Sequence, residues 1–259
     1  MTTTVFDAKL KIVASDSRWS AQVDLPDGIY LVYADDTNFH KIVVRTGAAL
    51  VLAGDGQLIA EWKNWWVRDD IDSSNMPDVA LSEIRLVSVM LIARDGTILF
   101  DAGPKKALLD VNTKGYVGIF SGTGSDYAAE CFDQNRNAVV AVNSAKEKDL
   151  CSGGTVMFTE LATMRHNLHS ENYDYNSVVS ALQNRGMIMK IASKNNSAND
   201  ASSIDISAHA HADYIRDGLS SGSIRACAPS GESEFRWTEA RIEKLKLAID
   251  KVVAMEKEL

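Results

Sequence analysis

The 259-residue sequence lacks any apolar run close to the ~18 residues needed to cross a bilayer. It also lacks an excess of positive charge, because 27 lysines and arginines stand against 35 aspartates and glutamates, for a net charge of −8. A general binder of nucleic acid needs a basic face, so the composition argues against nucleic-acid partners. The N-terminus has no basic region followed by an apolar stretch. We therefore expect no secretory signal, no membrane insertion and a cytoplasmic location.

Cysteine and metal-ligand patterns are scarce as well. Cys131, Cys151 and Cys227 are an odd number of thiols and form no Cys-x-x-Cys pair, which favours a reducing compartment over a disulfide framework. His209 and His211 are expected to share one face of a strand. A metal site needs three or four ligands, and no further ligand pattern lies near them. We therefore expect no metal and no other cofactor.

The composition that remains is that of an ordinary globular protein, with 46% hydrophobic and 24% charged residues. The length fits one large domain, or a typical domain with an appendage. Strand-like patterns dominate the first third of the chain, and the run 48–53 is apolar on both faces, as in a covered central strand. The expected strands of this part cover residues 3–6, 9–14, 28–34 and the two halves of 40–56, which join at Thr46–Gly47.

Helical periodicity appears next. Leucine, isoleucine and tryptophan recur at helical spacing over residues 57–68. A hairpin with Asp95–Gly96 at its turn and a strand over 116–120 follow, and Ser125 is expected to cap one or two helices over 126–150. Residues 155–161 return to strand. This order predicts sheets with helices stacked outside them.

The pattern weakens after about residue 165. Residues 166–194 predict one helix and a short strand, whereas 195–214 and 228–234 are polar and loop-like. The last stretch, 237–259, predicts an amphipathic helix. Its apolar stripe consists of Ile242, Leu245, Ile249, Val252 and Val253.

Five short motifs occur along the first two thirds of the chain. In order they read TTTVF (2–6), VASDSR (13–18), HKIVV leading to LAGDG (40–56), SGTGSDYA (121–128) and DLCSGG (149–154). Each is weak alone. In this order and at close to these spacings they resemble the proteasome β-subunit family of N-terminal nucleophile hydrolases, which includes the bacterial HslV-like peptidases. The resemblance covers roughly residues 2–165.

The chemistry of a leading threonine can also be argued from its own groups. A hydroxyl is a poor nucleophile at neutral pH and needs an adjacent base. An α-amine has an ordinary pKa of about 7.7–8.0, so an N-terminal threonine carries nucleophile and base on one residue. Thr2 takes this role provided that Met1 is removed. A strand holds it in place because reacting atoms must be positioned to a fraction of an ångström.

The resemblance implies roles for three further residues. Lys41 looks like the lysine that lowers the pKa of the hydroxyl and the amine, and Asp16 like the aspartate that pairs with this lysine. The backbone N–H of Gly54 matches the family's oxyanion-hole donor. The first hairpin is about two residues shorter than the family's, so Thr3 is an alternative to Thr2 at the position of the nucleophile.

Four other positions follow from the same resemblance. Asp149 and Ser152 match the supporting pair near the terminal amine. Thr123 stands where the family usually has a serine, a departure that keeps the hydroxyl and adds a methyl group. Leu52 falls where the family builds the floor of its side-chain pocket, and an apolar floor favours cleavage after apolar residues.

The fold implied is α+β, a four-layer αββα sandwich. Residues 1–165 would form the proteasome-like core, and residues 166–259 a C-terminal extension with the terminal helix. The implied function is a threonine peptidase that acts on peptide or unfolded protein inside a homo-oligomeric ring, with an unfolding ATPase as a possible partner. Two alternatives stay open. If Met1 is retained the amine is absent, and the chain would be a catalytically inactive scaffold or binding protein. The other alternative is an amidohydrolase of small amides.

Overall fold

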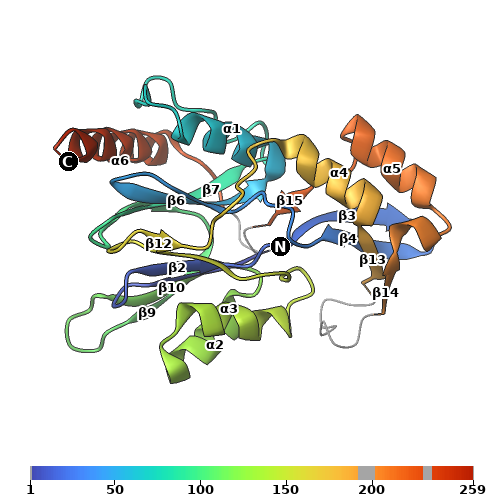
Figure 1. Cartoon of the computed structure of the whole chain (residues 1–259), viewed down its shortest axis with the longest axis horizontal. Helices are drawn as coiled ribbons and strands as arrows, with labels where there is room; N and C mark the ends of the chain where they lie inside the picture. Colours follow the sequence, from blue (N-terminus) through green and yellow to red (C-terminus); the bar gives the residue numbers. More distant parts are fainter. Residues whose placement is uncertain (1, 192–201, 230–234, 259) are drawn as a thin grey trace.

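The computed structural model describes residues 2–191, 202–229 and 235–258 (Figure 1). Two antiparallel sheets lie face to face, and helices cover the outer face of each. The fold class is therefore mixed α and β, with two large sheets and, in the described residues, six α-helices. The expected stacking of sheets with helices outside them is present.

The first sheet contains the N-terminal strand in its interior. β1 pairs antiparallel with β2 on one side and with β10 on the other. Across the sheet the order is β12 (Arg165–His166), β11 (Met157–Glu160), β2 (Ile12–Ser15), β1 (Thr3–Asp7), β10 (Tyr116–Gly122) and β9 (Lys105–Leu109).

Within the described residues the second sheet has nine strands, and β5 (Ile42–Val44) is a short strand paired with part of β6. The other strands run in the order β14 (Ser203–Asp205), β13 (Met187–Lys190), β4 (Gly28–Ala34), β3 (Trp19–Leu25), β15 (Cys227–Ala228), β6 (Ala48–Asp55), β7 (Val87–Ala93) and β8 (Ile98–Ala102). The segment after residue 166 thus supplies three strands of this sheet.

The helices divide between the two outer faces. The first sheet is covered by α2 (Ser125–Asn135) and α3 (Ala138–Lys146), whose apolar residues pack on β1, β2 and β10. The second sheet is covered by α1 (Gly56–Trp66), α4 (Tyr175–Arg185), α5 (Ala212–Ser221) and α6 (Glu239–Lys257). In Figure 1, α2 and α3 lie below the paired sheets, and the other four helices lie above them.

Helix α1 shows how local sequence sets these layers. Asp55 ends β6 and caps the helix, since its side chain accepts the backbone N–H groups of Gln57 and Leu58. Trp62 and Trp66, four residues apart, then share one face and are fully buried on the second sheet. The aromatic stripe is therefore core of the second sheet.

The side chains of β1 alternate between the two faces of the first sheet. Phe6 lies in the cluster between the two sheets, whereas Val5 lies in the cluster beneath α2 and α3. Because successive strand residues point to opposite faces, Thr2 and Thr4 lie on the side of Phe6, and Thr3 on the side of Val5.

Several predictions from the sequence were wrong in detail. The cap of α2 is Gly124, without a side-chain hydrogen bond, and Ser125 is the first helical residue. His209 ends a short 3₁₀ helix (Ile206–Ala208) and His211 precedes α5, so they do not lie on a strand. Strands β3, β9 and β15 and helix α5 had no clear sequence pattern. The loop-like stretches expected at 195–214 and 228–234 are wrong in part where the structure describes them, since residues 203–205 form β14, α5 begins at Ala212 and Ala228 belongs to β15. Residues 195–201 and 230–234 lie outside the described residues.

The described residues contain no helix that combines the length and the apolar character needed to cross a membrane.

We expect Leu245→Ala in α6 to lower the free energy of unfolding by about 2–5 kcal/mol, because it empties a buried site in the core of the second sheet. Leu247→Ala, on the same helix, is the matched control: Leu247 is 68% exposed and Leu245 0%. The control should stay within about 0.5 kcal/mol of the parent protein. Denaturant unfolding of both variants measures the difference. Equal effects would show that α6 does not pack as described.

Candidate active site

The carboxylate of Asp16 is the meeting point of the residues predicted from the sequence. Asp16 directly follows β2, and its own N–H donates to the carbonyl of Thr3 at 3.1 Å. Its Oδ1 accepts the hydroxyl of Thr2 at 2.5 Å, the backbone N–H of Thr3 at 2.9 Å and the ammonium of Lys41 at 2.8 Å. The structure therefore brings Thr2, Asp16 and Lys41 into contact.

The second oxygen of the same carboxylate is held by backbone donors. Asp16 Oδ2 accepts the N–H groups of Arg18 and Gly153, each at 3.1 Å. Together with the three donors on Oδ1, five hydrogen bonds fix this one side chain. They leave the carboxylate little freedom to move away from Lys41.

Lys41 and Asp16 form an ion pair that is closed to solvent, since both side chains are 0% exposed. Burial lowers the pKa of Lys41 below its ordinary value, while the nearby charge of Asp16 acts in the opposite direction. The indole of Trp19 lies 5.9 Å from the ammonium. An ammonium in this setting exerts a strong field on neighbouring groups, because little water screens it.

The supporting residues cluster on the other face of β1. The hydroxyl of Ser152 donates to Asp149 Oδ2 at 2.6 Å, and Thr123 donates to the same oxygen at 2.8 Å. Ser152 Oγ is also 2.7 Å from Thr3 Oγ1. Because a hydroxyl has one proton and that of Ser152 is used, Thr3 is the donor in this contact. The structure thus brings Thr123, Asp149 and Ser152 together around Thr3.

The sequence left Thr2 and Thr3 as alternatives for the leading position. Thr2 is the residue whose hydroxyl contacts the Lys41–Asp16 pair, and Thr3 is the one turned toward Ser152. The predicted residues therefore form two groups, one on each face of the strand end, rather than one group around a single threonine.

Two glycines of the SGTG loop let β10 approach β1 this closely. A Cβ at Gly122 would lie 1.8 Å from the carbonyl oxygen of Thr2, and one at Gly124 would lie 2.0 Å from Thr3 Oγ1. Gly122 also has φ +89°, a conformation that favours glycine. No other residue type fits at either position without moving the threonines.

Gly54 occupies the end of β6 in a conformation that needs glycine. Its φ is +122°, and a Cβ there would lie 2.2 Å from the carbonyl of Leu86. Leu52 N–H donates to Lys41 O and Gly56 N–H donates to Ala226 O. Since alternate residues of a strand point their N–H groups to the same edge, the N–H of Gly54 points to the edge next to Lys41.

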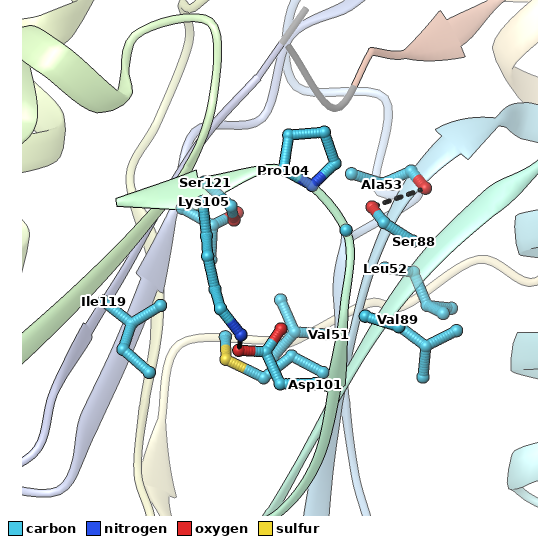
Figure 2. A pocket seen from close by; sticks show the side chains of 14 residues that line it. Val51, Leu52, Ala53, Ser88, Val89, Asp101, Pro104, Lys105, Ile119 and Ser121 are labelled. Atoms are coloured by element: carbon cyan, nitrogen blue, oxygen red, sulfur yellow. Dashed lines mark hydrogen bonds and ion pairs between the residues drawn. The ribbon is translucent and has the colours of Figure 1, made fainter. Parts of the chain in front are cut away.

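Leu52 also lies on β6. It belongs to the core between the second sheet and α1, where it is fully buried. It also borders an open pocket between the sheets that encloses about 340 Å³, part of it solvent (Figure 2). Thr4 lines this pocket, as do Asp101 and Lys105, which form an ion pair. Thr2 is not among the lining residues. On β1 the pocket therefore begins at Thr4, two residues after the candidate nucleophile Thr2.

Arg18 is a structural part of the site that the sequence did not single out. Its guanidinium makes a two-pronged contact with Asp35, at 2.8 and 2.9 Å, and donates to the carbonyl of Leu150 at 2.7 Å. A Cβ at Gly153 would lie 2.3 Å from this guanidinium. Arg18 therefore ties the Asp16 turn to the 149–153 loop. The signal was its place inside the SDSR motif, two residues after Asp16.

In this arrangement the candidate site is closed. Thr2, Asp16 and Lys41 are all buried, and so are Asp149 and Ser152. The geometry supplies a hydroxyl oriented by a carboxylate and an ammonium beside it, which are the components for activating a threonine. A substrate can reach the Thr2 hydroxyl only if the residues that bury it move.

We expect Asp16→Asn to lower the free energy of unfolding by about 3–5 kcal/mol, because it leaves the buried ammonium of Lys41 without its counter-charge. Asp24→Asn is the control, since Asp24 is exposed on β3 and its replacement should change stability by less than about 0.5 kcal/mol. Denaturant unfolding at pH 7 measures both. An Asp16 variant as stable as the control would contradict the ion pair.

A scan of the chain against protein-family models finds no match, and a search of the curated proteins finds no relative. The assignment of a function therefore depends on the residues and geometry of the site.

Proposed function

We propose that the chain is an N-terminal threonine hydrolase with the αββα fold of the N-terminal nucleophile hydrolases, and that it cleaves peptide bonds once Met1 is removed. One observation carries the proposal. The hydroxyl of Thr2, which immediately precedes the interior strand β1 of the first sheet, shares the oxygen of Asp16 with the buried ammonium of Lys41. The five motifs and their order support the same conclusion.

In the proposed reaction the α-amine of Thr2 takes the proton of the hydroxyl as the oxygen attacks the substrate carbonyl. The tetrahedral oxyanion is held by the backbone N–H of Gly54. Collapse breaks the C–N bond, and the leaving amine receives the proton from the α-amine. Water, activated by the same amine, then hydrolyses the ester on Thr2 and restores the free hydroxyl.

Lys41 and Asp16 have separate tasks in this scheme. The ammonium of Lys41 favours the ionised form of the hydroxyl and the neutral form of the amine, because positive charge nearby lowers both pKa values. Asp16 keeps that ammonium in place. The hydroxyl of Thr2 donates to Asp16 in the resting arrangement, so the reaction begins with rotation of this proton toward the amine.

The substrate class and assembly follow from the family resemblance. We propose peptide or unfolded protein as substrate, a homo-oligomeric ring that encloses the sites, and an unfolding ATPase as the partner that feeds them.

A second candidate function is a catalytically inactive scaffold of the same fold. It is favoured by the complete burial of Thr2 and by the pairing of Gly54 with Ala228, which together leave no room for a substrate. Retention of Met1 would make this the function of the chain.

The test is to measure the intact mass of the purified protein and then treat it with a β-lactone or epoxyketone that modifies an N-terminal threonine. We expect loss of Met1 and one label per chain. Thr2→Ala should abolish the label. Thr4→Ala, which changes a buried threonine on the same face of β1, should keep it. A label that survives in Thr2→Ala, or a chain without Met1 that takes no label under any condition, would refute the peptidase.

The labelling rate of the wild-type protein should rise with pH through an apparent pKa at or below about 8. This is the ordinary range of an α-amine, and the neutral amine is the active base. Lys41→Met should lower the rate about 10²-fold, the lower part of the range for a group that assists proton transfer. A pH-independent rate would contradict the role of the amine.

A further inference from the structure

The second sheet is joined in its middle by a very short strand. β3 and β6 pair with each other nowhere in the described residues; instead both pair with β15, which is only Cys227 and Ala228. The register places Cys227 opposite Ser20 of β3 and opposite Asp55 of β6, antiparallel to both. Without β15 the sheet would contain an open slot one strand wide between β3 and β6.

This slot lies on the edge of β6 along which Lys41 also pairs, through the bond from Leu52 N–H to Lys41 O. Ala228 pairs with Gly54, whose N–H points to this edge of β6. Burial raises the pKa of the Cys227 thiol, and the charge of Lys41 acts in the opposite direction. The strand therefore occupies the backbone donor that the proposed reaction needs for its oxyanion.

Main-chain atoms of residues 226–228 form most of the hydrogen bonds that hold β15 in place. Ala226 donates its N–H to the hydroxyl of Tyr175 at 3.0 Å, and its carbonyl accepts from that hydroxyl at 3.4 Å and from Gly56 N–H at 3.2 Å. The thiol of Cys227 donates to the carbonyl of Ser20 at 3.5 Å. Gly56 allows this approach, since a Cβ there would lie 2.5 Å from the ring of Tyr175.

The side chains of the strand add little to this attachment. Ala226, Cys227 and Ala228 are small, so they bury far less apolar area than the leucines and valines of the neighbouring strands. A segment held by main-chain hydrogen bonds between two strands is the arrangement by which an extended polypeptide inserts into a sheet. A second polypeptide of this conformation can therefore take the place of β15 and form the same main-chain hydrogen bonds.

We propose that β15 is an autoinhibitory insert, in which the chain's own residues 226–228 fill the slot that an extended polypeptide occupies between β3 and β6. Displacement of β15 frees the N–H of Gly54 and opens the path to Thr2. The inference rests on the proposed function for its catalytic consequence, but the occupancy of the slot is measurable without catalysis.

The experiment measures peptide binding in the full chain carrying Thr2→Ala, so that no turnover contributes. The probe is a fluorescein-labelled peptide that copies residues 222–229 with Cys227→Ser, and its fluorescence anisotropy is followed. Tyr175→Phe removes the hydroxyl that clamps Ala226 and leaves a buried N–H unpaired, which should raise the open fraction about tenfold or more. The apparent affinity should improve by the same factor, because it scales with that fraction.

The matched control is Tyr214→Phe on the exposed face of α5, which should not change the affinity. A peptide of the same sequence with N-methylated backbone nitrogens, which cannot donate the main-chain hydrogen bonds, should bind neither protein. Equal binding by the Tyr175 variant and its parent, or equal binding of the N-methylated peptide, would overturn the proposal.

A redox lock provides an independent measurement, also in the Thr2→Ala chain. Ser20→Cys places a thiol opposite Cys227, and facing residues of antiparallel strands have the separation that a disulfide needs. With the bond mapped by peptide mass, the oxidised protein should bind the probe at least about tenfold more weakly than the reduced protein. The same affinity in both states would overturn the proposal.

The two proposals fail in different ways. Peptide binding that responds to Tyr175→Phe and to the lock supports the insert even if Thr2 takes no label, in which case only the peptidase fails. If Thr2 takes the label but neither change affects peptide binding, the peptidase proposal stands and the insert is refuted.

Discussion

The buried carboxylate of Asp16 is the constraint on which the rest of the site depends. A single charged group receives the first threonine hydroxyl, a lysine ammonium and three backbone N–H groups from separate segments. Burying this charge is unfavourable unless every donor is in place, so the segments can close only together. The position of Thr2 is therefore a property of the assembled fold and not of the N-terminal strand alone. In the proposed hydrolase, the same contacts that stabilise the closed fold orient the nucleophile.

Local patterns were sufficient for much of the fold, and the family resemblance named the residues that meet at Asp16. The strand over Gly28–Ala34 has the predicted bounds, and the tryptophan spacing identified α1. Thr2, Asp16 and Lys41 were named from short motifs, and the structure brings them into contact. The strand and the helix were predictable because they depend on hydrophobic periodicity within one segment, whereas the three site residues were named from the resemblance of the motifs.

What the sequence could not provide is long-range pairing. β15 is two small residues in a polar stretch, and its partners lie more than 170 positions earlier, so no local period reveals it. The choice between Thr2 and Thr3 was open for a related reason, because a shift of one residue in β1 exchanges its two faces. Only the pairing of Thr3 with Gly122 and of Thr4 with Ser15 fixes that register.

A double-mutant cycle between Asp16→Asn and Lys41→Met measures the coupling between the buried carboxylate and ammonium, with the free energy of unfolding as the measured quantity. Each single change leaves one member of a buried pair without its partner, whereas the double change removes both charges together. We expect the double variant to lose at least about 2 kcal/mol less free energy of unfolding than the two single losses added together. Additivity within about 0.5 kcal/mol would contradict the buried ion pair, because the two groups would then not be in contact in the folded protein.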